Sequence, residues 1–167
     1  MHQTIARTEG QRPIIKGRLG PLSDDIRVPA YQAFLLLWAA FTVAPFLFGL
    51  DKFFNWMTFW PNYLWVGFPH LLGVAPQTFM YGVGVVEMVA GVLVFLLPRF
   101  APYVVACWLA GIITNLVIIS AVRGGHANVF WDIALRDFGL LVAALALGRL
   151  AATYAPNPFR TKANRLS

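Results

Sequence analysis

Four long apolar segments dominate the hydropathy pattern of this 167-residue chain. They cover residues 31–50, 77–97, 101–122 and 133–152, and each holds 20 to 22 residues. At a helical rise of about 1.5 Å per residue, each segment would cross a hydrocarbon layer of roughly 30 Å. None shows the strict alternation expected of a membrane barrel strand. The pattern therefore predicts an all-α membrane protein, a bundle of four transmembrane helices.

The connection between the first two segments is unusually aromatic. Residues 51–76 read DKFFNWMTFWPNYLWVGFPHLLGVAP. Such rings favour the membrane–water interface, where the ring is buried and its polar edge stays wet. We expect an aromatic interfacial segment, a short helix or a re-entrant hairpin broken at Pro61 and Pro69. Two interpretations are open: a membrane anchor with no ligand, or a lid over a pocket.

The distribution of charge divides and orients the chain. Residues 1–30 form a polar N-terminal arm, residues 31–152 the membrane domain and residues 153–167 a polar tail. The arm lacks the apolar core of a cleavable signal peptide. Most of the 13 Lys and Arg residues lie in the two tails and in the turn at Arg99. Because basic residues stay on the cytoplasmic side, both termini are expected to be cytoplasmic.

Composition excludes several classes of protein. Only 12% of residues are charged, whereas soluble domains average about 25%. The net charge of +6 is not arranged as basic runs interleaved with aromatic residues, so no nucleic-acid partner is expected. Cys107 is the single cysteine, which excludes an internal disulfide. We expect no metal site and no intrinsic cofactor, since the nucleotide, zinc and haem patterns are missing.

Polar residues inside the apolar segments are the candidate site. Charges within a membrane are costly and usually face a partner or a cavity. Helical spacing places Gly84, Glu87 and Gly91 on one face, and Cys107, Gly111 and Asn115 on one face of the next helix. We expect a polar pocket in the outer half of the bundle, with five ligand-binding candidates: Lys52, Glu87, Asn115, Arg136 and Asp137.

The start of the last apolar segment carries three charges. Asp132 and Arg136 are four residues apart, with the acid first, which is the favoured order for a helical ion pair. We expect these two to form a structural ion pair. Asp137 projects about 100° away from Arg136 and needs another partner, either Lys52 or Arg123.

This polar set has more than one interpretation. It could pin the four helices together without binding anything. It could also hold a quinone carbonyl or a lipid head group through Glu87 and Arg136. A proton or ion pathway is a third alternative, and a transporter ranks last because no inverted repeat is visible.

The chain resembles the DoxX/DoxD-like family of small four-helix bacterial membrane proteins over roughly residues 31–150. The matching features are GLDK at Gly49–Lys52, EMVAG at Glu87–Gly91, the Pro-containing turn after the second helix and the charged start of the fourth. The aromatic insertion at 53–72 and the N-terminal arm depart from the family pattern. Family residues are therefore carried over only at Lys52 and Glu87.

The resemblance implies a role in quinone-linked oxidation or in a membrane oxidoreductase assembly. We expect a small integral subunit of a quinone-linked or respiratory complex in the bacterial inner membrane. It would have no catalytic centre of its own. Its partners would be other membrane subunits and lipids, and a quinone or lipid would be its bound molecule. The alternative is a purely structural accessory subunit that binds no substrate.

Overall fold

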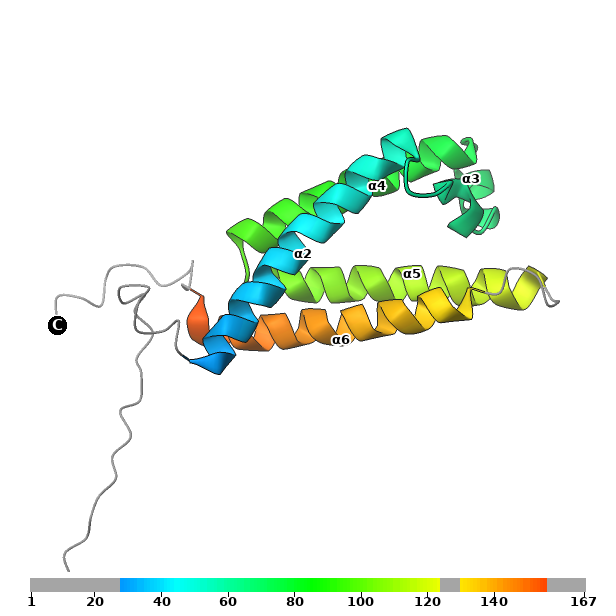
Figure 1. Ribbon diagram of the computed structural model, residues 1–167. Helices are drawn as coiled ribbons and strands as arrows, with labels where there is room; N and C mark the ends of the chain where they lie inside the picture. Colours follow the sequence, from blue (N-terminus) through cyan, green and yellow to red (C-terminus); the bar gives the residue numbers. More distant parts are fainter. Residues whose placement is uncertain (1–27, 124–129, 156–167) are drawn as a thin grey trace, which may run out of the picture.

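The computed structural model describes residues 28–123 and 130–155, and these form helices without a β-strand (Figure 1). The order is α2 (Pro29–Phe54), η1 (Trp60–Tyr63), α3 (Gly67–Leu72), α4 (Pro76–Leu96), α5 (Ala101–Arg123) and α6 (Trp131–Tyr154). The prediction of an all-α fold is confirmed for this part of the chain. The expected arm and tail lie almost entirely outside it.

Three of these helices are long and apolar enough to cross a membrane. They are Pro29–Phe54, Pro76–Leu96 and, within α5, Ala101–Val122. The helix α6 has 24 residues but also carries Asp132, Arg136, Asp137 and Arg149. The three apolar helices indicate a multi-pass membrane protein.

The first helix is longer than its apolar segment. Helix α2 runs on to Phe54, so that Asp51 and Lys52 form part of its last turn and are buried. It ends at Asn55, which adopts a left-handed conformation with φ of 53° and donates its N–H to the Asp51 carbonyl. Asn tolerates this conformation better than most residues. The helix therefore extends four residues beyond the apolar segment predicted at about 31–50.

The helices form two pairs, α2 with α4 and α5 with α6 (Figure 1). The pairs meet at one end, near the turn between α4 and α5, and diverge toward the other end, where η1 and α3 lie. We call these the tail end and the aromatic end. The residues that join α2 to α4, 55–75, are called the aromatic segment.

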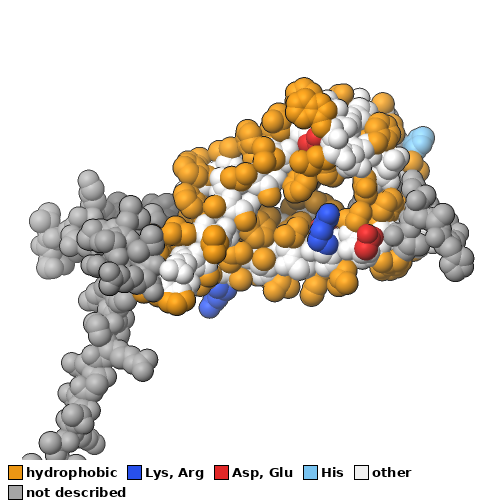
Figure 2. Space-filling model, viewed as in Figure 1, with side chains coloured by type: hydrophobic (Ala, Val, Ile, Leu, Met, Phe, Trp, Pro, Cys, Tyr) orange, Lys and Arg blue, Asp and Glu red, His pale blue; other side chains and the backbone are white. Residues whose placement is uncertain are grey.

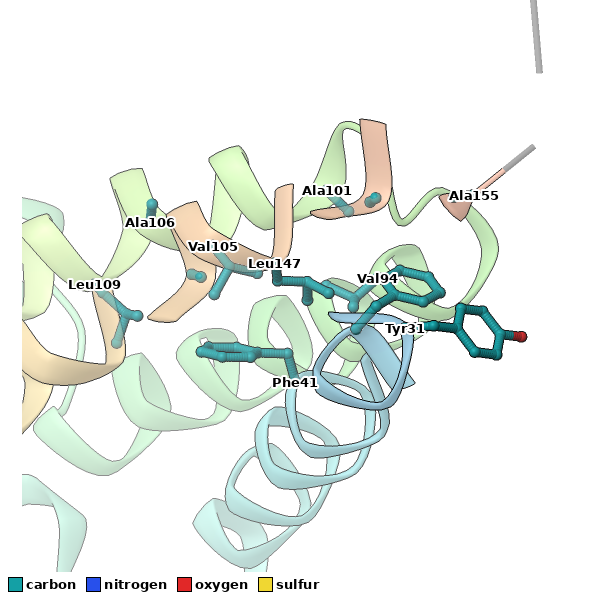
Figure 3. Packing of buried hydrophobic residues seen from close by; sticks show 12 residues of the cluster. Tyr31, Phe41, Val94, Ala101, Val105, Ala106, Leu109, Leu147 and Ala155 are labelled. Atoms are coloured by element: carbon teal, nitrogen blue, oxygen red, sulfur yellow. The ribbon is translucent and has the colours of Figure 1, made fainter. Parts of the chain in front are cut away.

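Apolar packing joins the two pairs at the tail end (Figure 3). Val94 of α4 and Leu147 of α6 are completely inaccessible, and Phe41 of α2 packs in the same cluster. The guanidinium of Arg99 donates to the carbonyl oxygens of Ala152 and Ala155, at 2.7 and 3.4 Å. These bonds satisfy groups that the end of α6 leaves unpaired. The core therefore fixes all four long helices at one end.

Glycines bring α2 and α4 into backbone contact. A Cβ on Gly49 would lie 2.5 Å from the carbonyl oxygen of Gly84, and one on Gly91 would lie 2.7 Å from that of Thr42. Only residues without a side chain allow this approach, which strengthens van der Waals contact between membrane helices. Gly84, Glu87 and Gly91 are all buried, as their spacing predicted.

Candidate polar site between the helix pairs

Lys52 and Glu87 form a buried ion pair between α2 and α4. The Lys52 ammonium lies 2.5 Å from Glu87 Oε2, and the two side chains are 4% and 11% exposed. The same ammonium lies 3.8 Å from the centroid of the Trp60 ring. An unpaired charge is costly inside a membrane. The pairing avoids this cost, because each group neutralises the other. The structure thus brings together two of the five predicted site residues.

Trp108 of α5 was not among the predicted site residues. Its indole N–H is buried and has no hydrogen-bond partner within the described residues, although it interacts with the nearby Glu87 carboxylate. A buried indole N–H usually finds a partner. The available sequence signal was a tryptophan well inside an apolar helix, away from the ends where this residue is favoured.

Asp137 of α6 is buried and takes its cation from the adjacent residue. Arg136 donates from Nε and Nη2 to Asp137 Oδ1, both at 3.2 Å. The Arg136 side chain is 66% exposed, so the arginine of this pair lies at the protein surface and the aspartate lies in the interior. The Asp137 carboxylate also acts electrostatically on Glu87. Lys52, one of its two predicted partners, pairs with Glu87 instead.

The predicted ion pair of Asp132 with Arg136 is wrong. Asp132 is exposed in the first turn of α6, whereas the Arg136 guanidinium contacts Asp137. A buried carboxylate gains more from a cation than an exposed one does. Burial of Asp137 therefore outweighs the favourable spacing of the other pair.

Asn115 of α5 contacts the aromatic segment. Its amide nitrogen donates to the Tyr63 carbonyl at 2.6 Å, and its amide oxygen accepts from the Trp65 N–H at 2.9 Å. Cys107 and Gly111 are exposed, so the face that they share with Asn115 does not point into the bundle as expected. The segment folds back onto α5 and uses Asn115 there.

Asp51 is a second residue that sequence reasoning did not select. Its carboxylate accepts from the backbone N–H groups of Trp56 and Met57 and, at 2.7 Å, from the Trp60 indole. These bonds fold the chain immediately after α2. Together with Asn115, Asp51 anchors the aromatic segment.

The two pairs leave a hollow between them toward the aromatic end, with a basic side chain at its edge (Figure 2). A smaller cavity of about 170 Å³ lies where the segment meets α5, lined by Leu64, Trp65, Val66, Ile119 and Val122. An apolar cavity of about 240 Å³ opens on α2 and α4 around Phe46, Gly91 and Phe95. The charged pairs lie in neither cavity.

Within the described ranges, no three His, Cys, Asp or Glu side chains come together to hold a metal ion. The chain matches no protein-family model, no curated protein and no solved structure. Fold and site together define a helical multi-pass membrane protein with charged groups buried between its helices. Membership of the DoxX/DoxD-like family stays a prediction.

Proposed function

We propose that this chain is a small integral subunit of a quinone-linked or respiratory membrane complex. Its polar groups between the helix pairs would hold the head of a quinone or lipid. The observation that supports this proposal is the gathering of Glu87, Trp108 and Asp137. Glu87 of α4 interacts with Trp108 of α5 and with Asp137 of α6 inside one apolar bundle.

The chemistry of these groups suits a quinone. Quinone carbonyl oxygens accept hydrogen bonds, and the Trp108 indole is a buried N–H donor beside the Glu87 carboxylate. The Arg136 guanidinium has five N–H groups and, among the described residues, one carboxylate oxygen as partner, so it can donate further. In this proposal the subunit binds and orients the quinone, and a partner subunit supplies the electrons.

The proposal places the chain in a bacterial inner membrane with α6 as a fourth span. Large apolar side chains such as Leu135, which is 72% exposed, cover the outward face of α6. Asp137 is turned inward, and Arg136 and Arg149 are long enough to reach the interface along their apolar stems. With four spans, the two tails would lie together on the cytoplasmic side, as the basic residues predict.

A purely structural accessory subunit is the second candidate. It is favoured by the fact that Lys52, Asp51 and Asn115 are each hydrogen-bonded to protein groups. In that case the polar residues hold the fold and the aromatic segment, and the surface packs against a larger complex. Ligand content distinguishes the two candidates.

The test is native mass spectrometry of the protein extracted from its own membranes in mild detergent. We expect an added mass that corresponds to a quinone or lipid. Trp108→Phe and Glu87→Gln should lose it, while Trp131→Phe, at an exposed position, should retain it. A wild-type protein that carries no such mass, and appears only with larger subunits, would favour the structural candidate.

A further inference from the structure

The aromatic segment is fastened to both helix pairs. On the α2 side, three donors of the segment bond to Asp51, and Lys52 lies over the Trp60 ring. On the α5 side, Asn115 bonds to the Tyr63 and Trp65 backbone groups. The segment therefore spans the end at which the two pairs diverge.

These two fastenings differ in strength. Asp51 and Lys52 are charged, and charge-assisted hydrogen bonds are roughly twice as strong as neutral ones. Asn115 is neutral, and it is the single α5 side chain with a hydrogen bond to the segment within the described residues. The ring of Tyr63 adds an apolar contact to Phe130, with centroids 4.9 Å apart. In hydrogen bonding, the attachment to α5 is thus the weaker of the two.

The free side of the segment is apolar. Trp56 is 80% exposed and Leu71 is 84% exposed, and the Trp56 ring stacks on Phe54 at the exposed end of α2. An apolar surface at the end of a membrane helix is suited to the interface between lipid and water. Movement of the segment away from α5 along this interface would keep its rings in lipid.

We propose that the aromatic segment is a lid over the polar site, hinged at Asp51 and latched to α5 by Asn115. Release of the latch would widen the entrance to the hollow between the helix pairs at the aromatic end, for a quinone head arriving from the membrane interface. This inference rests on the proposed function, because it regulates access to the same site. In this inference Asn115 controls the rate at which the ligand enters the site, and not the affinity with which the ligand binds.

The test follows the exchange of decylubiquinone by stopped-flow quenching of tryptophan fluorescence in the detergent-solubilised full chain. Asn115→Leu removes both latch bonds at similar volume. We expect the association and dissociation rates each to rise about tenfold, because loss of the two bonds removes roughly 1.4 kcal/mol of the free energy that holds the lid closed. The dissociation constant should be unchanged. Thr114→Val is the matched control, because its exposed hydroxyl bonds only to its own helix at the Ala110 carbonyl.

A second variant locks the lid and leaves Asn115 intact. Tyr63→Cys and Phe130→Cys, in a Cys107→Ser background, are bridged by a short thiol cross-linker with a cleavable disulfide. Exchange should stop on cross-linking and return on cleavage. Because this variant keeps the latch, it remains informative if Asn115→Leu folds poorly.

The outcomes separate the two proposals. If the wild type shows quenching but neither Asn115→Leu nor the cross-link changes the exchange rates, the lid is overturned and the quinone site stands. If the wild type shows no saturable quenching, the quinone site is overturned, and with it the lid as a regulator of access.

Discussion

The ammonium of Lys52 lies 2.5 Å from the carboxylate of Glu87, in an interface where both side chains are nearly inaccessible. Removal of one partner would leave a buried charge uncompensated. We expect Lys52→Met or Glu87→Leu alone to lower the free energy of unfolding by about 3–5 kcal/mol. Thermal unfolding in detergent, followed by circular dichroism, measures the loss.

The double variant Lys52→Met with Glu87→Leu should recover most of that stability. A well-packed apolar pair can replace a buried ion pair at little cost or with a gain. The two single losses would therefore be strongly non-additive. Additive losses would mean that the two charges are solvated independently, contrary to the observed pair.

The glycine contact between α2 and α4 gives a steric prediction. In Gly49→Ala the new methyl would meet the backbone carbonyl of Gly84, which cannot rotate away. We expect a loss of about 1–3 kcal/mol in unfolding free energy. Gly82→Ala in α4 is the control, because nothing beyond its own stretch of helix lies within 4 Å of its Cβ position. It should be neutral or should stabilise the helix by up to about 1 kcal/mol.

Replacement of Asp51 should loosen the aromatic segment without unfolding the bundle. In Asp51→Ala the backbone N–H groups of Trp56 and Met57 lose their acceptor. Hydrogen bonds to a charged group contribute about 1.5–3 kcal/mol, so amide hydrogen exchange there should quicken at least tenfold. Asp132→Ala, at an exposed position, should leave these rates unchanged. Equal protection in both variants would show that the segment is held by other contacts.

The contact of Arg99 with Ala152 predicts which ends share a side of the membrane. In a Cys107→Ser background, single cysteines at Phe100 and Ala152 should react with an impermeant maleimide from the same side. If α6 is a fourth span, a cysteine at Trp131 should react from the opposite side. Labelling of all three from one side would show that α6 does not cross.

The helices and the inward position of Glu87 were predictable because lipid imposes them. A 20-residue apolar segment has few alternatives to a helix, and Gly84 and Gly91 marked the face of α4 that packs most closely. Local rules were sufficient wherever the decisive neighbours belonged to one helix.

The rest of the site depended on contacts between distant segments. Asn115 meets Tyr63 and Trp65 only after an irregular segment folds back across 50 residues of chain. Arg136 pairs with Asp137 rather than with Asp132 because Asp137 is buried. Helical spacing alone does not show which residue is buried. Trp108 became notable only when its indole was found inside, near Glu87.

The division into two helix pairs has a consequence for biosynthesis. Helices α2 and α4 leave the ribosome before α5 and already hold their complementary glycines and both members of the Lys52–Glu87 pair. They can therefore associate in the bilayer with the charges of Lys52 and Glu87 already paired. Asn115 is synthesised later, so the aromatic segment, continuous with α2 and α4 and bonded to Asp51, lacks its hydrogen bonds to α5 until that helix has been inserted. Translation order thus makes the contact with α5 the last fastening of the segment to form.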